Sequence, residues 1–586
     1  MKGIAPYPHP SPQPSPYASA LRDWAGGASF YKIKKETRLT ASPRPFALVR
    51  FRKPRAVCAA AFALALAGLA GCAPHHAASA RHGDVFTVAV ANNVTTFDPA
   101  TCQDVETNQV LMNAYEGLVQ YSPDNKVVPC LADKWDVSKN GLVYTFHLRP
   151  GVQFQNGMPV TASDVAYTLR RALDPKLASP VAQQYLGDIA GANDVYSGKA
   201  AALKGVKVVN PQTVAVTITS PKAYWLATLT YPTAWIVCKA IAEKRGTDRL
   251  TSDDAIAGAG SGAFHVTKFR KDQEVDMEPN AHYWGGAPKV HLVEKVILDP
   301  NTRHSEFVNG QLDLMRKLTI GDMVTDKADA RVKDSVKVWP RAGMYYLALN
   351  QNVYKPFNDV RVRQAFAYAT DKKKLVDVAS GGVYPIAYDL LPPGIPGTDP
   401  NFRGLPYDPA KARQLLAAAG YPNGKGLPPL DIMGNEKEPL TQKTIDMLRQ
   451  MYAQNLGVTI NEHQMEFGAL IAGEDNNKTL PSFFLGWYAD YLDPQDFYSL
   501  LLSTQSVENH TGYSNPQLDA LCAQADVEQD STKRMALYRQ AAQIAGNDVP
   551  RIPLYIGVDP ELISAHTRGI EDCLMGHLPF KHVTVN

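Results

Sequence analysis

The 586-residue chain lacks the short motifs that mark the common catalytic and metal sites. It contains no GxxxxGK[ST] phosphate loop, no G-x-S-x-G nucleophile elbow and no H-E-x-x-H zinc motif. Its seven cysteines include no C-x-x-C pair, which argues against a metal cluster or a thioredoxin-like redox site. The sequence therefore pairs no nucleophile with a base, and it predicts neither an enzyme nor a bound cofactor or metal.

A basic field is also missing from most of the chain. Residues 1–58 hold eleven of the 60 Lys and Arg residues but only two of the 57 acidic residues, Asp23 and Glu36. The remainder carries 49 basic and 55 acidic side chains. This balance excludes an electrostatic surface for nucleic acid.

The chain has no apolar run long enough for an ordinary membrane span. The run from Ala56 to Gly71 has sixteen residues, whereas a transmembrane helix needs ~20. It follows Arg55 and other basic residues, as in a signal peptide, and Leu69-Ala70-Gly71-Cys72 resembles a bacterial lipobox. We therefore expect a lipid anchor on Cys72 and a place in the periplasm or on the outer face of the cytoplasmic membrane. The alternative is a buried Ala-rich helix with a chance cysteine.

The region before this run has the wrong composition for a folded segment. Proline alternates with other residues from Pro6 to Pro16, and no Met occurs between Met1 and Met112. We expect residues 1–48 to be a mis-assigned start or a disordered leader, with translation beginning near Val49. Residues 49–71 would then be the signal peptide and residues 72–82 a linker.

Five cysteines remain beyond Cys58 and Cys72, and their number is odd. One or two disulfides are expected if the compartment is oxidising. These cysteines are Cys102, Cys130, Cys238, Cys522 and Cys573.

Strand-like and helix-like patterns alternate along the body and predict a mixed α/β protein. No repeat of fixed period occurs, which argues against a solenoid or a propeller. The predicted elements are a strand at 85–90, a helix at 107–118, a β-hairpin turning at Pro150-Gly151, and helices opening at Thr161, carrying Val362 to Ala369, and following Asp408.

Gly258 to Ala263 reads GAGSGA and matches a loose dinucleotide-binding fingerprint. That motif works only between a strand and a helix, because the helix N-terminus receives the pyrophosphate. The following residues, AFHVTKF, alternate like a strand. A nucleotide site is therefore not expected.

The stretch GWYADYLDP, Gly486 to Pro494, sets Asp490 among Trp487, Tyr488 and Tyr491. This carboxylate has four candidate roles: catalytic acid, metal ligand, structural cap, or anchor for a cationic ligand. Acid–base catalysis usually takes a second titratable partner, which the sequence does not identify. Asp493 precedes Pro494, which is typical of a turn or a helix start.

Nine segments in fixed order resemble the large bacterial solute-binding lipoproteins of ABC importers for oligopeptides and dipeptides, the extracellular solute-binding proteins of family 5. The resemblance runs from about Val85 to Pro553. The segments begin at Thr96 (TFDPA), Tyr115 (YEGLVQY), Pro129 (PCLADKWDV), Gly260 (GSGAFHVTKF), Pro279 (PNAHYWGGAPKV), Val308 (VNGQLDL), Tyr345 (YYLALNQN), Tyr407 (YDPAKARQLL) and Gly486 (GWYADYLDP).

The resemblance implies an α/β, two-lobed periplasmic-binding-protein-like fold of the class II type, with an additional third domain. Two crossing segments would join the lobes, which close on a ligand. The implied borders place lobe I at 83–128, 240–345 and 553–586, the additional domain at 129–239 and lobe II at 346–552.

The resemblance also implies ligand-binding residues. Asp490 would pair with the α-ammonium group of a peptide, and Trp487 would offer an apolar wall. Gln103, Asp104 and Val105 lie where relatives bond the peptide main chain, and Tyr345 and Tyr346 lie where relatives place cleft tyrosines. The alternative is that Asp490 caps a helix or bonds local backbone while the aromatic residues belong to the core.

One segment departs from the family pattern. Dipeptide-specific relatives carry an Arg for the ligand carboxylate in a segment that here reads LLPPGIPG, Leu390 to Gly397, without an Arg. A strict dipeptide binder is therefore in doubt, and longer ligands gain weight.

The function that follows is a monomeric, lipid-anchored receptor that delivers a peptide to an ABC permease and ATPase. Rival interpretations are a metal chelate, oligosaccharide or opine ligand on the same fold, a periplasmic hydrolase, or a ligand-sensing adaptor.

Overall fold

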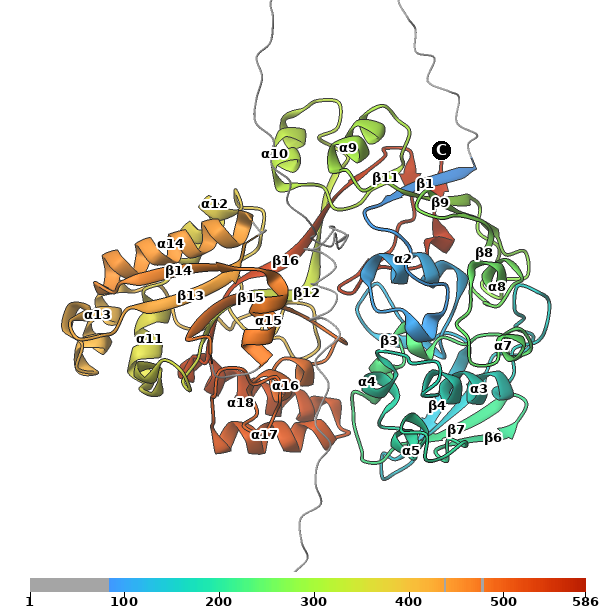
Figure 1. Cartoon of the computed structure of the whole chain (residues 1–586), viewed down its shortest axis with the longest axis horizontal. Helices are drawn as coiled ribbons and strands as arrows, with labels where there is room; N and C mark the ends of the chain where they lie inside the picture. Colours follow the sequence, from blue (N-terminus) through green and yellow to red (C-terminus); the bar gives the residue numbers. More distant parts are fainter. Residues whose placement is uncertain (1–83, 437–438, 476–478) are drawn as a thin grey trace, which may run out of the picture. The chain divides into compact units, whose positions relative to one another are not determined.

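The polypeptide forms a mixed α/β structure, as the alternating patterns predict (Figure 1). The computed structural model describes residues 84–436, 439–475 and 479–586. The predicted leader, the signal peptide, Cys72 and the linker lie outside these residues.

One large mixed sheet joins strands from distant parts of the chain. It has ten strands, of which β1 pairs with β10 in parallel and β12 with β16 antiparallel. In spatial order the strands are β14 (Ile460–Met465), β13 (Leu430–Asn435), β15 (Ser482–Tyr488), β12 (Val336–Leu349), β16 (Arg551–Ile563), β11 (Leu314–Met315), β1 (Val85–Val90), β10 (His291–Val296), β9 (Glu274–Pro279) and β8 (Phe264–Arg270).

The two central strands, β12 and β16, are the longest and run side by side (Figure 1). Their antiparallel register shifts twice, between Pro340 and Met344 and again between Tyr345 and Tyr346. On its other edge β12 pairs with β15, and β16 pairs with β11. These two strands run through the borders predicted near residues 345 and 553, where the resemblance implies two crossing segments.

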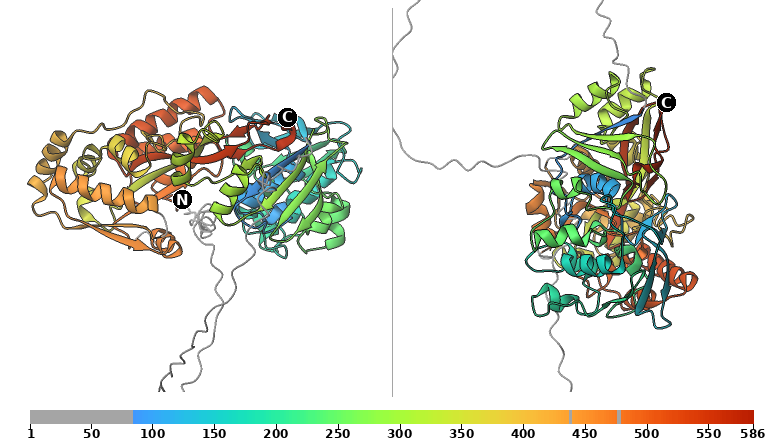
Figure 2. Two further views of the ribbon diagram at one scale, coloured as in Figure 1. Left: turned by 90° about the horizontal axis from the view of Figure 1, so that it is seen from above. Right: turned by 90° about the vertical axis from the view of Figure 1, so that its right-hand side faces the viewer.

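A second sheet is built from one continuous part of the chain and appears in teal in Figure 2. Helix α3 (Ala162–Ala172) contacts it at β6 and β7. The whole sheet lies inside the range 129–239 predicted for an additional domain, whose borders stay a prediction. In spatial order its strands are β4 (Ala132–Val137), β5 (Val143–Leu148), β7 (Thr213–Thr217) and β6 (Val206–Asn210).

The remaining elements surround the sheets or form short ribbons. The ribbons are β2 (Val119–Tyr121) with β3 (Val127–Pro129), β17 (Thr567–Arg568) with β20 (Thr584–Val585), and β18 (Asp572–Cys573) with β19 (Gly576–His577). The other helices are α2 (Val105–Ala114), α4 (Ala182–Leu186), α5 (Ala192–Tyr196), α6 (Trp225–Thr228), α7 (Lys239–Arg245), α8 (Ser252–Ile256), α9 (Pro300–Val308), α10 (Ile320–Ala328), α11 (Val360–Tyr368), α12 (Lys372–Ala379), α13 (Pro409–Ala418), α14 (Pro439–Leu456), α15 (Phe467–Asp475), α16 (Ser499–Leu502), α17 (Pro516–Val527) and α18 (Ser531–Asp548).

Several local predictions are confirmed because the capping chemistry is strong. Thr161 opens α3 with a reciprocal capping box to Asp164. Asp408 caps α13 by accepting a bond from Lys411 N, and Gly420 follows with a positive φ of 98°. The strand at Val85–Val90 has the predicted bounds, and the glycine-rich GAGSGA leads into strand β8 rather than a helix.

One predicted element is wrong, and another is present with shifted bounds. The segment after Pro150-Gly151 does not fold back on β5, because β5 pairs with β4 and β7 on its two edges. Helix α2 begins two residues earlier than predicted, since Asp104 accepts a bond from Thr107 N, and it ends at Ala114, before an extended Tyr115.

The expected disulfides are also absent from the described residues. Cys102, Cys130, Cys238, Cys522 and Cys573 are all free thiols and all buried. Burial raises the pKa of Cys573 to about 11, which holds this thiol in its protonated, unreactive form. These cysteines act as small apolar core residues.

A chain of ion pairs, most of whose members are buried, links the central strands to the C-terminal segment. Arg341 on β12 lies 2.5 Å from Asp559 and 2.8 Å from Asp572. His577 lies between Asp572, at 3.0 Å, and Glu561 on β16, at 2.8 Å. The other members of this chain of ion pairs are Arg316, Lys317 and Glu106, and Glu106 lies on the first turn of α2.

His577 is the imidazole in this chain of ion pairs, and its charge depends on the two carboxylates beside it. Burial opposes its charge, but Glu561 and Asp572 outweigh burial and raise the pKa of His577 to about 9. Only 2% of its surface is exposed. The imidazolium is thus a structural cation that holds two carboxylates from separate strands.

Replacing His577 with Gln is expected to lower stability more at pH 6 than at pH 9.5. The folded pKa of about 9 exceeds the ordinary value of 6.5, so the stabilisation is complete below pH 6.5 and is lost as pH rises through 9. A shift of this size corresponds to on the order of 3 kcal/mol. Urea unfolding at both pH values measures the free energy of unfolding that the substitution removes. The control is His582→Gln, at an exposed site. A difference that does not change with pH would contradict this assignment.

Candidate functional site

The side chain of Asp490 is buried and reaches across the fold to a partner 306 residues away. Strand β15 ends at Tyr488, and Asp490 follows two residues later with 5% of its surface exposed. Its Oδ2 accepts a hydrogen bond of 2.8 Å from Nε2 of Gln184 on α4. Its Oδ1 is buried and has no hydrogen-bond partner among the described residues. Asp490 is therefore neither a helix cap nor bonded to local backbone.

A second carboxylate, Asp496, supports this turn from within. Its Oδ2 accepts bonds from the Asp490 main-chain N–H and from Nε1 of Trp487, both at 3.1 Å. Asp496 is fully buried, and Trp487 is 9% exposed within a hydrophobic core. Trp487 thus packs in the core as well as bordering the turn.

The two carboxylates lie in surroundings that disfavour negative charge. Burial, followed by the charge of Glu508, raises the pKa of Asp490 to about 8. Burial and then Asp490 itself raise the pKa of Asp496 well above its ordinary value. A cation beside Oδ1 of Asp490 would relieve both effects. Within the described residues, no three His, Cys, Asp or Glu side chains are grouped to hold a metal ion.

Asp493 fixes the turn that presents Asp490. It caps the short helix at Pro494–Asp496, which confirms the helix start predicted there. Its two oxygens also accept bonds of 2.7 and 2.6 Å from Arg534 on α18. This bidentate buried pair keeps the turn from moving toward solvent.

Aromatic contacts join the turn to the segments around residues 121 and 224. Tyr491 stacks on Tyr224 with ring centroids 5.3 Å apart and planes 3° apart. The main-chain N–H of Leu492 donates to the Tyr121 hydroxyl at 3.0 Å. Together with Gln184, these contacts surround Asp490 with residues from distant parts of the chain.

A cavity of about 820 Å³ lies beside β15, four residues before Asp490 at Gly486. We call it the aromatic cavity. Rings that contact one another form part of its wall: Tyr345 lies 4.9 Å from Tyr555 and 5.8 Å from Phe484, centroid to centroid. Its wall also includes Lys317, Ile320, Val324, Val378, Tyr384, Asn435, Lys443, Phe467 and Asp559.

Next to this cavity, one edge of β15 faces away from its partner strand β12. The main-chain N–H of Ala489 donates to Ala342 O at 2.7 Å. Counted back from Ala489, the N–H and C=O groups of every second residue of β15 therefore point toward β12. Those of Gly486 and Tyr488 face the other edge. Among the described residues, β13 meets that edge only at Phe483.

The predicted tyrosines fall on opposite faces of β12. Tyr345 lines the aromatic cavity, and its hydroxyl accepts a bond of 3.3 Å from the Tyr488 hydroxyl. Tyr346 is 1% exposed on the other face, where the Arg551 guanidinium lies 4.6 Å from its ring centroid. Strand alternation therefore gives only Tyr345 to the cavity.

The segment Gln103 to Val105 forms the start of α2. Asp104 caps the helix and accepts a 2.7 Å bond from Thr95 Oγ1, while Gln103 and Val105 are exposed on either side. The next residue, Glu106, pairs with Lys317 at 2.7 Å, and Lys317 borders the aromatic cavity. This ion pair connects α2 to the cavity wall.

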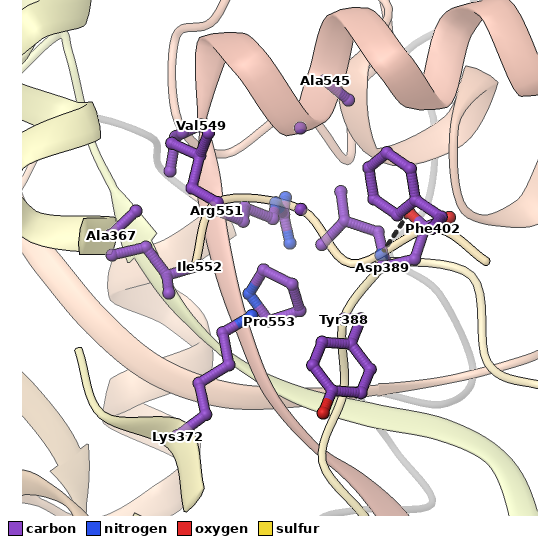
Figure 3. Close-up of a pocket in the computed structure, with 14 residues that line it drawn as sticks. Ala367, Lys372, Tyr388, Asp389, Phe402, Ala545, Val549, Arg551, Ile552 and Pro553 are labelled. Carbon is purple, nitrogen blue, oxygen red and sulfur yellow. Dashed lines mark hydrogen bonds between the residues drawn. The ribbon is translucent and has the colours of Figure 1, made fainter. Parts of the chain in front are cut away.

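A second, much smaller cavity of about 30 Å³ lies beside β16 (Figure 3). Lys372 Nζ donates to Ala387 O at 3.0 Å, and burial lowers the pKa of Lys372 to about 7. Burial also raises the pKa of Asp389 to about 6. This volume holds a water molecule or two and is too small for a solute.

Three residues of the site were not predicted from the sequence. Gln184 lies in an unremarkable stretch and reaches Asp490 only through the fold. Asp496 could have been noticed, because DYLDPQD places three carboxylates within seven residues. Tyr555, which lines the cavity, sits in a strand that gives no local sign of a binding role.

Known proteins resemble this chain over most of its length. The model of the bacterial extracellular solute-binding proteins, family 5 (middle), matches residues 126–509. The periplasmic oligopeptide-binding protein OppA of Salmonella typhimurium is 31% identical over 497 residues, which cover 82% of this chain and 89% of OppA. The dipeptide-binding protein DppE of Bacillus subtilis is 28% identical over 508 residues, or 84% of this chain and 91% of DppE.

The solved structures confirm the predicted fold. The murein tripeptide binding protein MppA, in its unliganded open form, superposes with a TM-score of 0.77 at 24% identity, covering 86% of this chain and 98% of MppA. The chain therefore has the predicted two-lobed α/β fold of periplasmic binding proteins. With the family model matching well over half of its residues, the chain belongs to the bacterial extracellular solute-binding proteins of family 5.

Proposed function

We propose that this protein is the extracytoplasmic substrate-binding component of an ABC importer and that it captures a peptide by its free N-terminus. The observation that carries this proposal is Oδ1 of Asp490, which is buried and has no hydrogen-bond partner among the described residues, just beyond the part of β15 that β13 does not pair. A peptide offers both groups that such a site needs: a cation at one end and a main chain that pairs with a strand edge.

The physical argument favours an ammonium group over a neutral donor. The Asp490 carboxylate is buried beside Asp496 and Glu508, so ionisation without a cation is costly. An α-ammonium brings a full charge and three N–H donors. The relatives OppA and DppE are named for oligopeptide and dipeptide binding, which agrees with this ligand class.

The rest of the proposal concerns the partners. The protein performs no covalent chemistry, acts as a monomer, and hands its ligand to a permease and ATPase complex. A lipid on Cys72 keeps it at the outer face of the cytoplasmic membrane, since the segment Leu69 to Cys72 resembles a lipobox. No helix in the described part of the chain is long and apolar enough to cross a membrane.

Peptides with a free N-terminus are expected to stabilise the protein, and Asp490→Asn is expected to abolish this effect. A ligand at a hundred times its dissociation constant adds about 2.7 kcal/mol to the free energy of unfolding. Removing one partner of a buried charge pair weakens binding by roughly 100-fold or more. Thermal unfolding with peptides of two to eight residues, each free or N-acetylated, measures both.

The matched control is Asp253→Asn, which removes a carboxylate from an exposed position on α8. Asp490→Asn is expected to fold at least as stably as the wild type without ligand, because it removes a carboxylate whose pKa is raised by burial. Stabilisation of Asp490→Asn by free peptides, or equal stabilisation of the wild type by acetylated ones, would refute the role of Asp490.

Replacing Cys72 with Ser is expected to release the protein from the membrane fraction of a bacterial cell. The thiol is the group that accepts the lipid, and a hydroxyl does not replace it. Fractionation together with incorporation of labelled fatty acid gives the readout. Cys58→Ser is the matched control within the same leader, and a membrane-bound Cys72→Ser protein would contradict the lipid site.

A further inference from the structure

We propose that the aromatic cavity selects an uncharged, bulky side chain of the ligand, aromatic or branched apolar, between its third and fifth residues. This inference rests on the proposed function, because it takes the ligand to be a peptide whose N-terminus lies at Asp490. It adds to that function a side-chain preference and the residues that impose it.

The position of the cavity along β15 determines which residue of the ligand places its side chain there. Gly486 borders the cavity and lies four residues before Asp490. Strand β15 ends at Tyr488, and an extended chain rises ~3.3 Å per residue, so Gly486 and Asp490 are at most about 13 Å apart. A ligand main chain extended along the same edge covers that length in about four residues.

The cavity wall is suited to apolar contact. Tyr345, Tyr384 and Tyr555 touch one another, with centroid distances from 4.9 to 6.3 Å. Val324 on α10 and Val378 on α12 line the same cavity with 53% and 60% of their surfaces exposed. Such exposed apolar residues around a concave site mark a place for an apolar ligand group.

Two of the three charged residues on the wall are already paired within the protein. Lys317 lies 2.7 Å from Glu106, and Asp559 lies 2.5 Å from Arg341. The third, Lys443, is exposed on α14. A charged ligand side chain would therefore lose water without gaining a free partner at Lys317 or Asp559.

Glycines on three adjacent strands make room for the rings beside the cavity. A Cβ added to Gly486 would lie 3.1 Å from the Tyr345 ring. A Cβ at Gly343 or Gly557 would lie 2.5 Å from Tyr488. The rings can thus lie flat across the strands, which keeps the cavity open.

The first experiment measures the dissociation constants of alanine pentapeptides by calorimetry. Each peptide carries Phe, Leu, Glu, Lys or Gly at one position, and all-alanine is the reference. We expect Phe and Leu at one of positions three to five to bind about tenfold tighter than alanine there, which is the scale of burying one large apolar side chain. At position one or two the same residues should give a smaller gain.

The second experiment compares Val378→Glu with Val527→Glu in the full-length protein. Val378 lines the cavity, whereas Val527, at the end of α17, is 49% exposed and does not line it. We expect Val378→Glu to cut the preference for Phe over Ala about tenfold, and Val527→Glu to leave it unchanged. Equal melting temperatures of the two variants show that the change is not a loss of folding.

The outcomes separate this inference from the proposed function. Binding of all-alanine peptides with no gain from Phe or Leu at any position overturns the inference and leaves peptide binding intact. A preference for Glu also overturns it and points to Lys443. Failure of every peptide, including all-alanine, removes both proposals.

Discussion

The antiparallel pairing of β12 with β16 is the constraint on which the rest of the structure depends. Both strands exceed the usual strand length, and each forms its other pairings with a different neighbour. Through β15 the pair positions the turn of Asp490, and through Tyr345 and Tyr555 it supplies part of the wall of the aromatic cavity. Through Arg341 and Glu561 it also supports the buried ion pairs. A shift in this register would move the cavity wall, the turn that carries Asp490 and the C-terminal segment together.

The turn that carries Asp490 and Asp496 holds two carboxyl groups whose ionisation is disfavoured by burial. Asp490 and Asp496 are buried close together, and each retains one oxygen without a hydrogen-bond partner among the described residues. What holds them is the surrounding scaffold: Arg534 clamps Asp493, and Tyr224 stacks on Tyr491. The cost of burying these two polar groups is thus offset by neighbouring contacts.

Local chemistry explains which parts of the fold could be predicted from the sequence. Thr161, Asp408 and Gly420 act through neighbours within a few residues, so their helix boundaries followed directly. The turn at Pro150-Gly151 led to a wrong hairpin prediction, because β5 pairs with strands that come before and after that segment. The residues of a turn do not by themselves determine which strands pair. The five body cysteines were expected to pair in part, but the fold uses each as a separate core residue.

The candidate site shows the same limit. Asp490 was recognisable because it lies among three aromatic residues in a stretch resembling a known family. Its partner Gln184 was not, since the contact spans 306 residues and belongs to the tertiary structure alone. Tyr345 and Tyr346 were indistinguishable in the sequence until the sheet fixed which side each faces. The register of β12 against β15, rather than composition, assigns Tyr345 to the cavity.

The hydrogen bond from Gln184 occupies one of the two oxygens of the Asp490 carboxylate. Oδ2 of Asp490 already accepts a bond of 2.8 Å from Gln184, so Oδ1 is the oxygen that has no partner among the described residues. At Oδ1 a neutral donor would add one hydrogen bond, while a cation would add a Coulombic attraction that an amide does not offer. The glutamine therefore holds one oxygen of the carboxylate in place and leaves the other for a charged group.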